Sequence, residues 1–117
     1  MMNSIKIAPR LWFEESLLGA TLNYQSSNDP ESGVFFRVGM SFHSLLDCDQ
    51  RLGRLSCLWT IKDGSLCVRG DHEELTLIFS AVDGSPIQAG LSLFGEELQA
   101  FRYAVNALAS RQMVSLN

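Results

Sequence analysis

The 117-residue sequence lacks the signatures that usually reveal a function. It contains no nucleotide-binding glycine loop, no closely spaced set of metal ligands and no catalytic motif. No stretch approaches the roughly 18 to 20 apolar residues of a membrane span, and residues 1–10 contain no apolar stretch long enough for a signal peptide. These absences favour a cytoplasmic protein that needs no cofactor, no metal and no membrane.

The sequence also lacks a disulfide framework. Its three cysteines, Cys48, Cys57 and Cys67, are odd in number and contain no C-x-x-C pair. Cys57 and Cys67 fall in strand-like runs, where a free thiol behaves as a small apolar side chain. Reduced, buried thiols are typical of cytosolic proteins, so the cysteines agree with a cytoplasmic location.

Basic residues are in the minority. There are 9 lysines and arginines against 13 acidic residues, which gives a net charge of −4. Binding of nucleic-acid phosphates normally relies on a surplus of basic residues, so the balance argues against nucleic acid and suits a basic protein partner. The composition, 46% hydrophobic and 19% charged, predicts one globular domain over residues 1–117 that folds without a metal or a disulfide.

Alternation of apolar and polar residues with a period of two predicts strands between residues 4 and 94. The clearest run is 33–43, where Val34, Phe36 and Val38 lie on one face. Asp63-Gly64 and Asp83-Gly84 are typical of hairpin turns, so the last four strands should form an antiparallel meander. The expected strands lie around residues 5–7, 11–15, 18–24, 33–43, 55–61, 66–68, 75–81 and 87–93.

The period changes near the end of the chain. Apolar residues recur at steps of three and four, as expected for a helix over about residues 95–110 that packs on the sheet, followed by a loose tail over 112–117. Residues 44–53 are ambiguous and suit either a loop or a short helical turn that contains Asp47 and Asp49. The apolar stripe of the expected C-terminal helix contains Phe94, Leu98, Phe101, Val105 and Leu108.

These elements predict a mainly β (α+β) fold. We expect a bent antiparallel sheet, or a small sandwich or barrel, of about six to eight strands with one C-terminal α-helix packed on it. Trp12, Phe35, Leu58 and Ile78 lie on the strand faces opposite the main apolar rows. Part of this second face should therefore be covered, by a curled sheet, by the helix or by a second copy in a homodimer.

The segment 90–98, with sequence GLSLFGEEL, leads from the last strand into the helix. It resembles the end of several small bacterial families built from a sheet and a helix. These include immunity proteins that neutralise secreted toxins and the transcriptional-coactivator type of single-strand binder. The resemblance covers less than a tenth of the chain, and it assigns no role to any residue.

Acidic residues form the candidate contact surface for a partner. Asp47 and Asp49 flank Cys48 in a predicted loop, where two carboxylates suit a divalent cation, acid–base chemistry or simple solvation. The run from Asp71 to Glu74 occupies a connection between strands, where it is either solvated or a negative surface for a basic partner. The candidate partner-binding residues are Asp47, Asp49, Asp71, His72, Glu73 and Glu74.

Two other sets of residues are candidate sites. His43, Cys48 and His72 would suit a metal site, or a cysteine nucleophile with a histidine base, but their spacings match no local motif. A single-stranded nucleic acid would need a surface of arginines and stacking rings, to which Phe35 and Trp59 would contribute. The arginines of that alternative surface are Arg37, Arg51, Arg54 and Arg69.

The leading hypothesis is a small, non-catalytic binding protein that engages a macromolecular partner, with toxin neutralisation or inhibition as one concrete form. The first alternative is a domain that binds single-stranded nucleic acid through the arginines. The second is a small enzyme or ligand carrier that uses the concave face of the sheet as its pocket.

Overall fold

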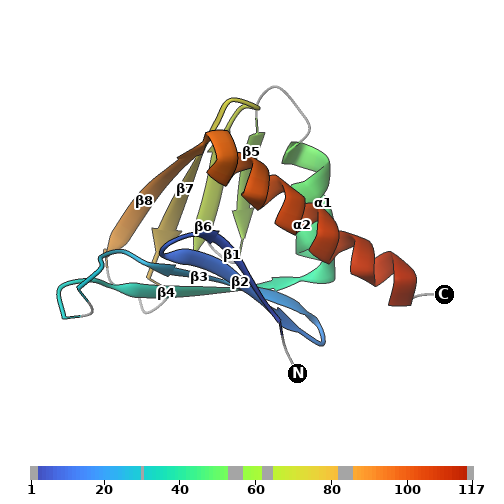
Figure 1. Cartoon of the computed structure of the whole chain (residues 1–117), viewed down its shortest axis with the longest axis horizontal. Coiled ribbons are helices and arrows are strands. Elements are labelled where there is room, and N and C mark those ends of the chain that lie inside the picture. Colours follow the sequence, from blue (N-terminus) through green and yellow to red (C-terminus); the bar gives the residue numbers. More distant parts are fainter. Residues whose placement is uncertain (1–2, 30, 53–56, 62–64, 82–85, 116–117) are drawn as a thin grey trace.

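The computed structural model describes residues 3–29, 31–52, 57–61, 65–81 and 86–115. The chain forms two four-stranded antiparallel sheets, each followed by a helix (Figure 1). The first sheet contains β1 (Ser4–Ala8), β2 (Leu11–Ser16), β3 (Gly19–Gln25) and β4 (Phe35–Ser41), in that order. The second sheet contains β5 (Cys57–Ile61), β6 (Leu66–Gly70), β7 (Glu74–Ser80) and β8 (Gln88–Phe94). The helices are α1 (Phe42–Leu52) and α2 (Gly95–Ser115).

This architecture confirms the predicted mainly β fold with a C-terminal helix packed on the strands. The last four strands form the expected meander, in which each strand pairs with its neighbour in sequence. The turns predicted at Asp63-Gly64 and Asp83-Gly84 lie outside the described residues. Along most strands, buried side chains alternate with more exposed ones as the sequence pattern requires. In β4 the buried side chains are Phe36, Val38 and Met40.

Helix α1 was not resolved by the sequence pattern. Phe42 and His43 were expected to end a strand, but they begin α1, and of the two alternatives for Asp47 and Asp49, a loop or a helical turn, the structure shows the helix. The hydroxyl of Ser41 accepts a hydrogen bond from the backbone N–H of Ser44 at 3.1 Å, which caps the helix. Phe42 happens to continue the alternation of β4, so the pattern alone placed the boundary too late.

Helix α2 is the expected closing helix, with two differences. It continues to Ser115 rather than ending near residue 110, so most of the expected tail is helical, and residues 116–117 lie outside the described part. An ion pair between Arg111 and Glu15 of β2 holds its last turns. Phe94 ends β8 instead of joining the helix stripe, because Gly95 has a φ of +61° and breaks the helical path there.

The core lies in a wedge between the two sheets. At the narrow side the rings of Tyr24 and Phe79 stack with centroids 4.9 Å apart, and Phe36 lies 5.7 Å from Phe79. Both helices occupy the open side, where they pack against each other (Figure 1). Phe101 of α2 meets Phe13 edge to face at 5.9 Å. The buried helix residues are Leu45, Cys48, Leu52, Leu98, Phe101, Ala104, Val105, Leu108 and Ala109.

The two halves of the chain repeat one arrangement of four strands and a helix. Helix α1 packs on β3 and β4 of its own sheet and on β5, whereas α2 packs on β7 and β8 and on β1. Tyr24 and Phe79, which stack on each other, are the penultimate residues of the corresponding strands β3 and β7. The two halves share this arrangement of elements and these buried positions rather than residue identities.

The outer faces of both sheets are open, because the helices lie inside the wedge (Figure 1). Phe35 and Leu58 are 48% and 61% exposed, and Trp12 and Ile78 are half-buried. The expected cover by a curled sheet or by the helix is therefore not present among the described residues. Within the same part of the chain, no helix is long and apolar enough to cross a lipid bilayer.

Candidate functional site

Asp47 and Asp49 point to different neighbours and do not form a carboxylate pair. Asp47 pairs with Arg51 one turn further along α1, with 3.2 Å between Oδ2 and Nε. Arg51 also donates from Nη1 to the carbonyl oxygen of Leu58 at 2.9 Å, which ties α1 to β5. Asp47 therefore serves the attachment of α1, and an exposed pair of this kind contributes about 0.5 kcal/mol.

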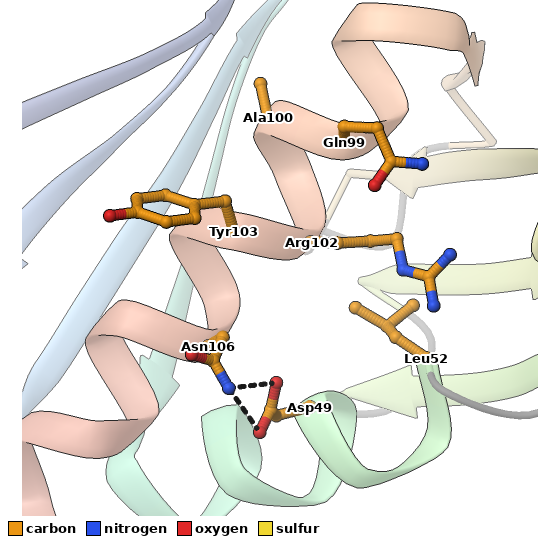
Figure 2. Close-up of a pocket in the computed structure, with 7 residues that line it drawn as sticks. All are labelled: Asp49, Leu52, Gln99, Ala100, Arg102, Tyr103 and Asn106. Carbon is orange, nitrogen blue, oxygen red and sulfur yellow. Dashed lines mark hydrogen bonds between the residues drawn. The ribbon is translucent and has the colours of Figure 1, made fainter.

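Asp49 faces the second helix across a shallow groove. Its two carboxylate oxygens both lie 3.3 Å from Nδ2 of Asn106, which donates to them (Figure 2). The groove has a volume of about 620 Å³, and Arg102 and Tyr103 leave α2 toward opposite sides of it. Its lining residues are Asp49, Leu52, Gln99, Ala100, Arg102, Tyr103 and Asn106. The groove lies between the two helices. Among its lining residues, no acid and base are arranged for catalysis.

Asp71 is the structural centre of the turn between β6 and β7. Its Oδ1 accepts hydrogen bonds from the backbone N–H groups of Glu73 at 2.8 Å and Glu74 at 3.1 Å. These bonds lower the pKa of the Asp71 carboxyl, because they favour its charged form. His72, Glu73 and Glu74 are exposed, and Glu74 begins β7 rather than belonging to the loop.

The turn lies beside the first residues of α2. Glu74 pairs in register with Phe94, which directly precedes Gly95 and the first turn of α2. We call the resulting carboxylate cluster the acidic end, and none of its members forms an ion pair with a described residue. The acidic end consists of Asp71, Glu73, Glu74, Glu96 and Glu97. Asp47 and Asp49 lie on α1 and are not part of it.

The cysteine and histidine candidates are not assembled. Cys48 is fully buried in the core, and burial raises the pKa of its thiol, which keeps it protonated. His43 is exposed on α1, and His72 is exposed in the β6–β7 turn. No group of three or more His, Cys, Asp or Glu residues suited to a metal ion occurs among the described residues.

The arginines expected to converge are divided between two places. Arg51 and Arg69 both lie near Leu58. Arg51 donates a hydrogen bond to its carbonyl oxygen, and Arg69 is its register partner on β6. Arg37 lies on β4 of the other sheet. Arg54 is outside the described residues, and Trp59 is buried in the core, where it is 4% exposed and unable to stack on a ligand.

Strand register assembles a different surface that sequence reasoning did not find. Lys6, Trp12, Asn23 and Arg37 are direct neighbours in one row across all four strands of the first sheet. On the same outer face the rings of Trp12 and Phe35 lie 5.9 Å apart, tilted by 34°. We call these five residues the aromatic face. The sequence marked Trp12 and Phe35 as unusual outward residues, but their adjacency depends on register.

Asn23 is the unusual member of the aromatic face, because it is fully buried there. Its Nδ2 donates to the carbonyl oxygens of Thr21 at 3.2 Å and Trp12 at 3.5 Å. Its Oδ1 is buried and accepts no hydrogen bond from any described residue. A buried acceptor without a donor costs about 1–3 kcal/mol, so the unpaired Oδ1 lowers the free energy of unfolding of this protein.

Side chains of both helices fill the open side of the wedge. Leu98, Phe101 and Val105 fill it from α2, and Leu45 and Cys48 fill it from α1. A pocket of about 310 Å³ remains between the β1–β2 turn, β8 and the start of α2.

No known family model, curated protein or solved structure matches this chain. The assignment of a site therefore depends on the geometry of the chain itself.

Proposed function

We propose that the protein is a non-catalytic binding protein that engages another protein through the aromatic face. The observation that carries this proposal is the Trp12–Phe35 ring pair on an open sheet face, where Trp12 also lies in one row with Arg37. Tryptophan and arginine contribute most of the binding energy at protein interfaces far more often than other residues, and aromatic residues are enriched there.

The chemistry of the face suits a protein segment with both apolar and polar groups. The two rings offer an apolar centre, and Lys6, Glu14 and Arg37 surround it with charge of both signs. Glu14 accepts a hydrogen bond from Nε1 of Trp12 at 3.1 Å, which fixes the orientation of the indole ring.

Within this proposal, neutralisation of a toxin or inhibition of an enzyme in the cytoplasm is the concrete role. The acidic end would assist by attracting a basic partner, since complementary charge raises the rate of association more than it raises the final affinity. Its carboxylates lack ion-pair partners among the described residues, so their charge is available for such attraction.

Site-specific photo-crosslinking tests the proposal. A photoreactive amino acid replaces Phe35 in one variant and Tyr103, an exposed aromatic residue on α2, in the control. We expect a discrete protein adduct from position 35 alone, in the cells that make the protein. The variants Arg37→Ala and Trp12→Ala should lower its yield by about tenfold or more at equal protein levels. Equal adducts from both positions, or none at position 35, would contradict the proposal.

Single-stranded nucleic acid is the second candidate ligand, and the same face favours it. Two rings flanked by Lys6 and Arg37 would stack bases and contact phosphates, and each stacked base contributes about 1–3 kcal/mol. Titration of a labelled oligonucleotide at low ionic strength separates the candidates. Two phosphate contacts predict that log K falls with log salt at a slope of about −1.4. A flat titration removes this candidate.

A further inference from the structure

Each sheet ends in two edge strands, and three of the four edges carry a feature that hinders pairing with another chain. Strand β1 has Lys6 and an irregularity in its register between Lys6 and Ala8. Strand β4 has the charge of Arg37 near its middle. Strand β5 is flanked by α1, and Arg51 occupies the carbonyl oxygen of Leu58.

Strand β8 has no such protection. From Gln88 to Phe94 it contains no charged residue and no proline, and it pairs with β7 without irregularity. Gly90 has no positive φ, and a Cβ at its position would meet only the carbonyl oxygen of Leu77, at an ordinary contact distance of 4.0 Å, so nothing among the described residues requires glycine there. A glycine inside a strand often marks a place where another backbone approaches closely.

The free hydrogen-bonding groups of this edge follow from strand alternation. The N–H of Ala81 donates to the carbonyl oxygen of Ile87 at 3.0 Å, which sets the phase of the ladder. Ala89, Leu91 and Leu93 therefore bond to β7, and the backbone groups of Gln88, Gly90, Ser92 and Phe94 face outward. No bond from the outward groups of Gly90 or Ser92 to a described residue is present.

We propose that β8 pairs antiparallel with β8 of a second copy of this chain, so that the two second sheets form one continuous sheet. A two-fold axis at Leu91, the centre of the strand, lets all of β8 take part. Gly90 then lies opposite Ser92 of the second copy, and Gln88 lies opposite Phe94, each as a hydrogen-bonded pair.

The chemistry of β8 fits an identical strand. Because the strand is uncharged, two copies meet without the like-charge contacts that destabilise cross-strand pairs. Phe94, which is 65% exposed, lies opposite Gln88 of the second copy on the outer face, so each end of the paired strands gains one contact of this kind. The two acidic ends would be separated by roughly 20 Å along the sheet, beyond the Debye length of about 8 Å.

Light scattering over a range of protein concentrations tests this pairing. The wild-type mass should rise from 13.0 kDa toward twice that value as the concentration increases. Ser92→Lys should raise the dissociation constant by about tenfold, because the charge enters the symmetric interface twice. Thr60→Lys is the matched control: it places a lysine on the outer face of the same sheet, on β5, and should behave as the wild type.

Hydrogen exchange locates the interface independently of these variants. The amides of Gly90 and Ser92 should gain protection as the concentration rises, and those of the aromatic face should not. A wild-type mass of 13.0 kDa at all concentrations, or equal dimerisation of Ser92→Lys, would overturn the pairing. Strand β8 and the aromatic face lie on different sheets. A negative result in this test therefore does not contradict the proposed function, and a negative crosslinking result does not contradict the pairing of β8.

Discussion

Replacing Asn23 with threonine is expected to stabilise the protein. Asn23 is fully buried on the outer face of β3, and its Oδ1 has no donor among the described residues. The two carbonyl groups that its amide contacts do not depend on it. The N–H of Gln25 donates to the carbonyl oxygen of Arg10, and by alternation Trp12 bonds to Asn23 and Glu14 to Thr21 through the backbone.

The magnitude follows from these contacts. Removal of a buried, unpaired acceptor recovers about 1–3 kcal/mol. Threonine has nearly the size of asparagine and suits a strand better, on a scale that spans about 1 kcal/mol. The loss of two weak amide bonds offsets part of this gain. We therefore expect the free energy of unfolding to rise by about 1–2 kcal/mol, with a Tm increase of about 4 °C for each kcal/mol.

Urea unfolding followed by far-UV circular dichroism measures this change, since it does not depend on the neighbouring Trp12. Gln25→Thr is the matched control, because Gln25 lies on the same strand and the same face. The control reports the gain from strand preference alone. If Asn23→Thr stabilises the protein no more than Gln25→Thr does, the reasoning about the unpaired Oδ1 is refuted.

The same variant separates stability from the proposed function. Because Asn23 is fully buried, Asn23→Thr should leave the crosslinking yield at position 35 unchanged while it raises stability. A stabilised variant with a lower yield would contradict this expectation.

Three further predictions concern the core, the acidic end and the cysteines. Phe101→Ala should lower the free energy of unfolding by about 3–5 kcal/mol in urea titrations, because its ring is fully buried. The pKa of Asp71 is lowered in the folded state, so its carboxylate contributes its full stabilisation above about pH 4, the ordinary pKa of an aspartate. This contribution is lost as the pH falls through the lowered folded-state pKa. Asp71→Asn should therefore reduce the loss of stability that the wild type shows at acidic pH. In the native protein, Cys67 should react with a thiol reagent before Cys48 and Cys57, whose pKa values are raised by burial.

The candidate site shows where sequence reasoning stops. Trp12 and Phe35 were identified as outward apolar residues, since alternation assigns each residue to a face. Their contact with each other and with Asn23 depends on the register of β2, β3 and β4, which alternation leaves open. Arg37 was proposed with three other arginines, but only register shows that its neighbours are instead Asn23 and, further along the row, Trp12 and Lys6.

The fold divides in the same way. The strands, the final meander and the closing helix were predictable, because period-two and three-to-four repeats of apolar residues are local consequences of which side faces the core. Helix α1 was left open between a loop and a short helical turn, since its buried residues Leu45, Cys48 and Leu52 are too few to distinguish the two.

By itself, the sequence determined which residues turn inward, since burial of apolar side chains is encoded in their spacing. Only the tertiary structure decided that the strands divide into two sheets, that Tyr24 meets Phe79, and that α1 and α2 fill the wedge. These contacts join segments far apart in the chain, and their geometry depends on packing between elements rather than on any local pattern.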